Sequence, residues 1–277
     1  MIKTINLGYQ YSKKVQIFNN LNLTFSPGKI YGLLGKNGAG KSTLIKNITG
    51  MLFPTKGISE VFGLVPKNRE VSFLKELFFV PEEYYLPNLT INELVTIYKD
   101  FYPNFDTNQF NNYTKEFKIE KSKKTTELSL GQKKKILIGF ALSANTKVLI
   151  MDEPTNGLDI PSKILFRNMI NDSFKKDRIV IITSHQVRDL DELIHSIIIM
   201  NDGEILLNND KDFIAKNLHF QLTDTLQDTI DLIYQEKVSN GFASIKKNNT
   251  NNAGYIDIEL LFNAVLTDES KINALLN

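Results

Sequence analysis

The sequence predicts an α/β fold built on a mostly parallel sheet, and three observations lead to this prediction. Short β-branched apolar runs without polar alternation recur along the chain, which is typical of strands buried on both faces. Stretches with helical spacing separate these runs. A glycine-rich pattern directly follows the first run, as in α/β proteins that bind phosphate groups. The expected parallel strands are Ile30–Leu34, Leu77–Val80, Val148–Met151 and Ile179–Thr183.

The first apolar run leads into the pattern G-x-x-x-x-G-K-S/T at residues 35–43. Backbone N–H groups of such a turn surround nucleotide phosphates, and a helix that begins near Lys41 directs its positive end at them. The alternative, a glycine-rich turn with a surface lysine, does not explain the preceding strand. We therefore expect a P-loop nucleotide hydrolase core, in which Lys41 reaches the outer phosphates and Ser42 holds Mg²⁺. The candidate binding residues of the loop are Gly35, Asn37, Gly38, Ala39, Gly40, Lys41, Ser42 and Thr43.

Between about residues 86 and 145 the pattern becomes helical and predicts a helical subdomain inserted into the sheet domain. Thr90 with Glu93, and Ser129 with Gln132, form capping boxes at the heads of the first and third expected helices. The second helix is indicated by aromatic residues at helical spacing, namely Phe110, Tyr113 and Phe117.

The run Val148–Met151 ends in two neighbouring acids, Asp152 and Glu153. A carboxylate at a strand end beside a phosphate loop can bind Mg²⁺ through water, and the adjacent one can orient an attacking water molecule. Two such acids can also cap the next helix, but the phosphate loop favours the catalytic interpretation. Further along, an Asp-Gly pair at residues 202–203 lies between two apolar runs and predicts a hairpin that forms an antiparallel edge of the sheet.

The composition changes after about Asp210, so we predict a domain over residues 1–210 and a C-terminal extension over residues 211–277. Strand-like runs at residues 229–238 and 242–245 precede a candidate helix. An Asn-rich stretch between the second run and this helix predicts a loop. These features predict a small α+β extension. The helix is expected at residues 257–266 and the loop at residues 248–252.

Charge and composition exclude several classes of protein. The formal net charge is only +2 and the basic residues are dispersed, so nucleic-acid binding is not indicated. We interpret Lys133–Lys135 as the solvated face of a helix. The absence of cysteine excludes disulfides and thiolate metal sites. The N-terminal residues do not resemble a secretory signal, and no apolar run approaches the ~20 residues that span a bilayer. We expect a cytoplasmic protein whose membrane work, if any, uses a separate chain.

The segment Leu128–Gln132 reads Leu-Ser-Leu-Gly-Gln and resembles the signature motif of ATP-binding cassette (ABC) ATPases, which power ABC transporters. In that family two nucleotide-binding domains close head to tail, and the signature of one subunit covers the γ-phosphate held by the other. An N-cap serine, a glycine and a helix N-terminus do form a compact anion site, although an ordinary helix cap would look the same. The resemblance implies ATP and Mg²⁺ as cofactors, and it implies that Ser129, Gly131 and Gln132 contact the ATP held by the partner subunit.

Other positions follow the order of the family's motifs over about three quarters of the chain. Tyr11 resembles the aromatic residue that stacks on adenine, with Val15 as a lesser packing candidate. His185 resembles the switch histidine that contacts the γ-phosphate and helps to place the attacking water. Asp159 matches the loop aspartate that crosses the dimer interface. The resemblance thus implies Lys41, Glu153 and His185 as catalytic residues and Ser42, Asp152 and Glu82 as metal ligands.

Two positions depart from the family's pattern. Glu82 stands where the family usually has a glutamine that binds Mg²⁺ and senses the membrane partner, so an additional negative charge is placed beside the phosphates. We hypothesise that Glu82 still couples the partner to the site. Leu130 stands at a signature position that is commonly glycine. The contacts expected from Ser129 and Gly131 do not need a bare Cα there, so we expect hydrolysis to survive.

The resemblance implies an ATP-binding and ATP-hydrolysing subunit that powers export through a separate transmembrane permease. We expect a homodimer, or a heterodimer with another ABC ATPase, located peripherally on the inner face of the cell membrane. Residues 86–106 resemble a bacterial subgroup linked to export of antimicrobial or toxic peptides, and the extension is a possible dimerisation element. Two alternatives stay open: a soluble ABC ATPase without transport, and a poorly hydrolysing partner in a heterodimer.

Overall fold

The computed structural model describes residues 1–186, 190–226, 230–250 and 253–276. Within these residues the central sheet has six strands in the order β5-β6-β7-β3-β8-β9. Neighbouring strands from β5 to β8 run parallel, and β9 pairs antiparallel with β8. The strands are β3 (Lys29–Leu34), β5 (Leu77–Val80), β6 (Val148–Asp152), β7 (Ile179–Ser184), β8 (Ser196–Asn201) and β9 (Glu204–Asp210).

The predicted parallel sheet with an antiparallel edge is confirmed. Every residue of β6 and β7 is buried, as expected for strands covered on both faces. Asp202 and Gly203 form the turn of the predicted hairpin with φ of +46° and +82°. This pair of left-handed residues lets β9 turn back along β8.

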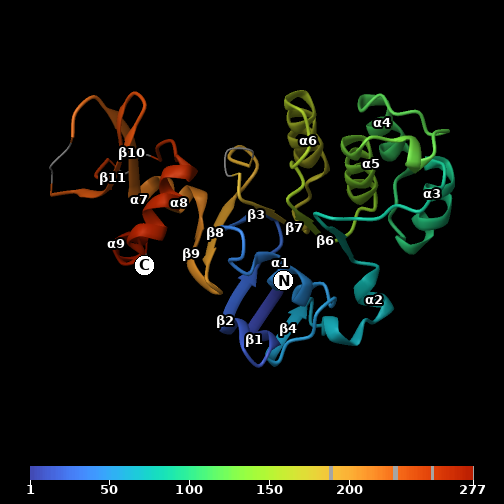
Figure 1. Cartoon of the computed structure of the whole chain (residues 1–277), viewed down its shortest axis with the longest axis horizontal. Helices are drawn as coiled ribbons and strands as arrows, with labels where there is room; N and C mark the ends of the chain where they lie inside the picture. The colour runs from blue at the N-terminus through green and yellow to red at the C-terminus, as the bar shows by residue number, and fades with distance from the viewer. Residues whose placement is uncertain (187–189, 227–229, 251–252, 277) are drawn as a thin grey trace.

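A second, antiparallel sheet lies beside the central one and was not predicted. Its order is β2-β1-β4, and Figure 1 shows it next to α1. Its pairing is interrupted by register shifts, and Asn6 and Asn20 adopt positive φ there. These irregularities break the polar–apolar alternation by which such strands are recognised. Its inner side chains share one hydrophobic cluster with α1 and the central sheet. The elements are β1 (Ile2–Ser12), β2 (Val15–Phe25), β4 (Lys56–Val61) and α1 (Lys41–Ile48).

The helices expected in the middle of the chain are all present and are grouped at one end of the molecule (Figure 1). The capping boxes at Thr90 and Ser129 are formed as predicted. Phe117, expected inside the second helix, is its C-cap residue. Aromatic rings, among them those of Phe78 and Phe140, pack this group against β5. The main helices are α3 (Ile91–Tyr98), α4 (Thr107–Glu116) and α5 (Leu130–Ser143), with shorter turns α2 (Val71–Leu74), η1 (Pro66–Asn68), η2 (Lys99–Phe101) and η3 (Thr125–Glu127).

After β7, the chain completes the hairpin and forms a C-terminal α+β unit with an antiparallel sheet in the order β10-β12-β11. The predicted strand at 229–238 begins only at Leu232, because Asp231 lies in a turn and Thr229 lies outside the described residues. The helix predicted from residue 257 is α8, which Asp257 caps. The elements are α7 (Lys211–Asn217), β10 (Leu218–Thr223), β11 (Leu232–Val238), β12 (Gly241–Lys247), α8 (Ile258–Thr267) and α9 (Glu269–Leu276); α6 (Ile160–Ser173) precedes β7.

The C-terminal unit packs against the antiparallel edge of the central sheet. Ile199 of β8 and Leu207 of β9 belong to the same buried cluster as Leu261 of α8 and Ile272 of α9. The Asn273 side chain also donates a hydrogen bond of 3.1 Å to the carbonyl oxygen of Leu206. The apolar core therefore runs without a break from the sheet into residues 211–277. In the described part of the chain, no helix combines the length and apolarity needed to cross a bilayer.

Candidate active site

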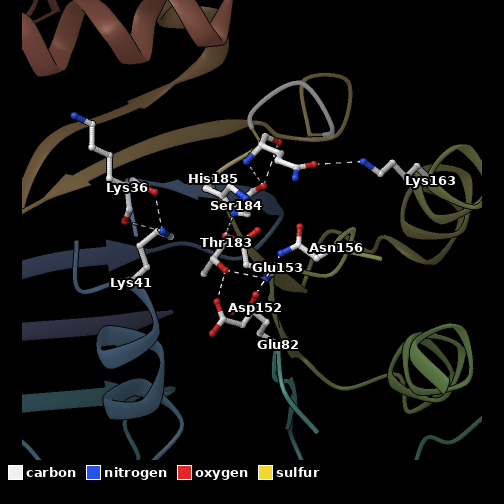
Figure 2. A network of polar contacts seen from close by, with 12 residues as sticks. Lys36, Lys41, Glu82, Asp152, Glu153, Asn156, Lys163, Thr183, Ser184 and His185 are labelled. Carbon is white, nitrogen blue, oxygen red and sulfur yellow. Dashed lines mark hydrogen bonds and ion pairs between the residues drawn. The ribbon is translucent and has the colours of Figure 1, made fainter. Parts of the chain in front are cut away.

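The glycine-rich loop connects the end of β3 to the start of α1 at Lys41. A Cβ atom on Gly35 would lie 2.4 Å from the carbonyl oxygen of Met200, so only glycine allows β8 to approach the loop so closely. Gly40 is the N-cap of α1 with φ of +106°, a conformation that L side chains rarely adopt. The Lys41 ammonium donates to the carbonyl oxygens of Gly35 at 2.7 Å and Lys36 at 3.2 Å. Figure 2 shows the Lys41 side chain beside Lys36. These contacts tie the Lys41 side chain to the backbone of the loop.

Lys41 places a buried positive charge in this loop. Its side chain is only 6% exposed, and this burial lowers the pKa of the ammonium. The carboxylates of Glu153, Asp152 and Glu82 act in the opposite direction, because negative charges nearby favour the protonated form. The arrangement suits the binding of an anion, whose charge would compensate the desolvated ammonium.

A cleft of about 390 Å³ opens between the loop and the carboxyl ends of the neighbouring strands. It gathers most of the residues that the sequence predicted, although they come from four separate segments. Val15 does not line it, and the nearby Ile17, which the sequence reasoning missed, does. The lining residues are Tyr11, Ile17, Asn37, Gly38, Ala39, Gly40, Lys41, Ser42, Thr43, Glu82, Asp152 and Glu153.

Thr183 of the neighbouring strand β7 contacts both of the adjacent acids at the end of β6, Asp152 and Glu153. The Thr183 hydroxyl donates to the Asp152 carboxylate and accepts a 3.1 Å hydrogen bond from the backbone N–H of Glu153. Glu153 has φ of +48°, which is uncommon for a residue with a side chain and occurs often at functional sites. Sequence reasoning had not singled out Thr183, because its role depends on pairing between strands.

The Glu153 carboxylate lies against His185. One oxygen, Oε1, is 2.9 Å from His185 Nδ1, and the carboxylate is almost completely buried. The other oxygen, Oε2, is buried without a hydrogen-bond partner among the described residues. A buried carboxylate oxygen is costly to leave unpaired, so it is suited to accept a hydrogen bond from a bound water molecule. Figure 2 shows His185, Glu153 and Asp152 at neighbouring strand ends.

The residues present fit a Mg²⁺ ion that is held mainly by nucleotide oxygens. In the described residues no three His, Cys, Asp or Glu side chains form a metal cage of their own. Mg²⁺ in nucleotide sites is usually bound by one or two protein ligands together with phosphates and water. Ser42 and Asp152 both line the cleft and supply oxygen atoms of the required kind. Glu82 lines it too and accepts a 3.3 Å hydrogen bond from the Asn156 side chain.

The residues that the resemblance assigned to a partner's nucleotide do not line this cleft. Ser129 caps α5 and accepts a hydrogen bond of 3.2 Å from Gln132 N, and Asp159 caps α6. Gly131 lines a neighbouring cavity of about 550 Å³ that also includes Glu82. A position away from the chain's own phosphate loop is what a role across a dimer requires, and that role stays a prediction.

The interpretation of Lys133–Lys135 as a solvated face of a helix is wrong for Lys134. Its side chain is 5% exposed, and its ammonium donates to the carbonyl oxygens of Glu153 at 2.7 Å and Asn156 at 3.1 Å. Burial lowers the pKa of Lys134, while the carboxylates of Glu82, Glu153 and Asp152 raise it. The prediction failed because this face of α5 packs on the turn after β6, a contact that helical spacing alone does not reveal.

Comparison with known proteins identifies the family of this chain. Residues 18–156 match the family model of the ABC transporter. The bacitracin transport ATP-binding protein BcrA of Bacillus licheniformis is 32% identical over 81% of this chain and 76% of its own length. The lantibiotic transport ATP-binding protein SrtF of Streptococcus pyogenes is 32% identical over 76% of this chain and 92% of its own.

Solved structures show the same fold. CbiO1 from Clostridium perfringens, described as part of the ABC transporter complex CbiONQ, has a TM-score of 0.62 at 25% identity, covering 76% of this chain and 88% of its own. The structure of an ATP-binding subunit of an ABC transporter has a TM-score of 0.70 at 22% identity. The match covers 77% of this chain and 91% of that subunit. The chain thus belongs to the ABC transporter family, as an ATP-binding and ATP-hydrolysing subunit.

Proposed function

We propose that this subunit powers the export of antimicrobial peptides through a separate transmembrane permease, and that it works as a dimer on the cytoplasmic face of the cell membrane. The observation that carries the catalytic part is the cleft in which the phosphate loop and Lys41 meet Glu153, whose carboxylate is paired with His185 behind the cleft lining. The transport part is supported by relatives named for bacitracin and lantibiotic transport. The partner ATPase is either a second copy of this chain or a related chain.

The main residues in and beside the cleft have defined tasks in this proposal. Lys41 and the amides of the loop neutralise phosphate charge, and Ser42 and Asp152 hold Mg²⁺, which when bound stabilises the charge that develops during phosphoryl transfer. Glu153 accepts a hydrogen bond from the attacking water through Oε2. His185 holds the other oxygen of that carboxylate and so keeps it directed at the water. Tyr11 stacks on the adenine ring.

The dimer couples hydrolysis to movement of the permease. Ser129, Gly131 and Gln132 of one subunit contact the nucleotide of the other, and Asp159 lies at the interface between them. Contacts that exist only in the closed dimer favour closure when ATP is bound, and their loss after hydrolysis favours opening. Glu82 is suited to report the state of the permease to the cleft, because it touches both the cleft and the cavity beside Gly131.

Glu153→Gln tests the catalytic part of the proposal. The amide keeps the size of the side chain but is a much weaker acceptor for a proton, so we expect ATP hydrolysis to fall by about 100-fold or more. ATP binding should persist, and an ATP-bound dimer should accumulate, which size-exclusion chromatography with light scattering detects. The control is Glu83→Gln, which makes the same change at an exposed residue that does not line the cleft. This variant should hydrolyse ATP normally. Normal turnover by Glu153→Gln would remove Glu153 from its role.

Purification from detergent-solubilised membranes tests the transport part. We expect the tagged chain to be recovered with one transmembrane protein, and addition of a bacitracin-like or lantibiotic peptide to raise ATPase activity of the reconstituted complex. A chain that hydrolyses ATP but is recovered without any membrane protein would favour a soluble ABC ATPase instead.

A further inference from the structure

Lys134 joins the helix that starts with the signature segment, α5, to the turn that carries Glu153. Its ammonium bonds to two carbonyl oxygens of this turn, those of Glu153 and Asn156, at 2.7 and 3.1 Å. A buried ammonium is tolerated only where hydrogen bonds replace its lost hydration. Two main-chain carbonyl groups of one short turn supply them here. The position of the turn and the position of the lysine are therefore linked.

Two further contacts bring α5 against the same turn. A Cβ atom on Gly131 would lie 3.2 Å from the carbonyl oxygen of Gly157, so the first turn of α5 passes close to the backbone after Glu153. One residue beyond Lys134, the Lys135 ammonium lies 3.9 Å from the Asp159 carboxylate. That ion pair is long and partly exposed, so it contributes little to the stability of this contact. The buried contact of Lys134 therefore restrains the turn more strongly than this ion pair does.

The turn needs such a restraint, because Glu153 does not adopt a relaxed backbone conformation. Its φ of +48° is unfavourable for a residue with a side chain and persists only where surrounding contacts enforce it. Thr183 holds the N–H of Glu153, and His185 lies against its carboxylate. Lys134 holds the remaining group, the carbonyl oxygen. The direction of the carboxylate is thus set from two sides, by α5 and by the end of β7.

The same lysine acts on a second carboxylate of the cleft. The Asn156 carbonyl oxygen accepts from Lys134, while the Asn156 side chain donates to Glu82 Oε1 at 3.3 Å. Displacement of the turn would therefore alter both Glu153 and Glu82. Lys134 itself does not line the cleft, so it acts through these residues and not on the nucleotide.

We propose that Lys134 is a positioning residue for ATP hydrolysis, which fixes the turn at residues 153–156 from the helix that bears the signature segment. The inference rests on the role proposed above for Glu153. In this arrangement the head of α5 and the Glu153 carboxylate of one subunit move together. Contacts that Ser129 and Gly131 make with a partner's nucleotide are thereby transmitted to the chain's own catalytic carboxylate.

Lys134→Met provides the first test, because methionine keeps an unbranched side chain in the buried space but has no donor. We expect kcat to fall about 10- to 100-fold, since small misplacements of a catalytic group have effects of this size. The dissociation constant for ATP, measured with a fluorescent nucleotide, should change less than about 3-fold, because the phosphate loop is untouched. Lys133→Met is the matched control on the adjacent, half-buried lysine and should leave both quantities unchanged.

Two measurements distinguish positioning from simple stabilisation of the fold. Without nucleotide, hydrogen exchange of the amides in residues 153–157 should be faster in Lys134→Met, while exchange in α1 stays the same. Lys134→Arg, which keeps the charge and the donors, should recover part of kcat. Loss of ATP binding together with faster exchange throughout the molecule, in both variants, would mean that Lys134 only stabilises the fold and would overturn the proposal.

A double-mutant cycle tests whether Lys134 acts through Glu153. In the Glu153→Gln background, Lys134→Met should lower the residual single-turnover rate by less than about 2-fold, since the group to be positioned is already lost. The full decrease in both backgrounds would overturn the proposal. If Glu153→Gln alone hydrolyses ATP normally, the role of Glu153 fails. If that variant is inactive but Lys134→Met is fully active, only the positioning role fails.

Discussion

Among single residues, Glu153 shows most directly how neighbouring groups prepare a side chain for chemistry. Its backbone adopts a left-handed conformation, and one carboxylate oxygen is already engaged by His185. The buried Oε2 is left without a partner in the described residues, which is unfavourable unless a ligand or water completes it. Local strain and an unsatisfied oxygen at one residue are explained together if the site is built to bind a water molecule beside the phosphates.

Tyr11 allows a prediction about recognition of the base. Its ring is 56% exposed at the cleft, and its hydroxyl lies 3.2 Å from Thr43 Oγ1. If the ring stacks on adenine, Tyr11→Ala should weaken ATP binding about 10-fold, since stacking on an aromatic side chain contributes ~1–3 kcal/mol per base. Tyr11→Phe keeps the ring and should bind within about 2-fold of the unmodified protein. Titration with a fluorescent ATP analogue measures both, and equal weakening in the two variants would assign the effect to the hydroxyl instead.

Capping boxes stabilise the first turns of helices α3 and α5 in the helical region, and α3 is the simpler case. Thr90 Oγ1 accepts from Glu93 N, while the Glu93 carboxylate accepts from both the N–H and the hydroxyl of Thr90. The hydrogen bonds from the Thr90 backbone and side chain lower the pKa of Glu93 below its ordinary value of 4.5. The folded state therefore favours the ionised carboxylate at the head of this helix.

The sign of this pKa shift predicts how stability varies with pH. Because the pKa of Glu93 is lower in the folded state, its contribution is complete above pH 4.5 and is lost as the pH falls through the folded-state pKa. Glu93→Gln does not titrate, so its urea-unfolding midpoint should lie below that of the unmodified protein at pH 7. The difference should shrink towards acid pH. Glu116→Gln, at the end of α4, is the control, and a difference that stays constant with pH would contradict the prediction.

At the scale of the whole molecule, residues 211–277 add buried apolar side chains to the hydrophobic core of the central sheet. Helix α8 contributes the fully buried Leu261 to the cluster that contains β8 and β9. The strand β8 also approaches the phosphate loop through Met200, as the contact with Gly35 shows. Removal of residues 211–277 would uncover this apolar surface, so truncation is a poor test of whether the extension mediates dimerisation. Point substitutions on its exposed surface are better suited to that question.

Leu261→Ala tests the continuity of the core. Loss of a fully buried leucine should lower the free energy of unfolding by about 2–5 kcal/mol. If the core is continuous, urea should release a bound fluorescent nucleotide and unfold the C-terminal unit at the same, lowered midpoint. Leu222→Ala, at a residue that is 60% exposed, should have little effect. Two separate transitions, with nucleotide release unchanged, would show that residues 211–277 fold independently.

The amino-acid sequence by itself determined the parallel strands, the phosphate loop, the paired acids and the capping boxes. Each of these is written in contiguous residues, because burial on both faces, a tight glycine turn and a helix cap impose local requirements. The antiparallel sheet escaped prediction where bulges near Asn6 and Asn20 interrupt its alternation. Tertiary structure alone decided that Lys134 is buried and that Thr183 orients Asp152. Both depend on contacts between residues distant in the chain. No local pattern encodes which side chains meet when α5 packs on the turn after β6 and β7 pairs with β6.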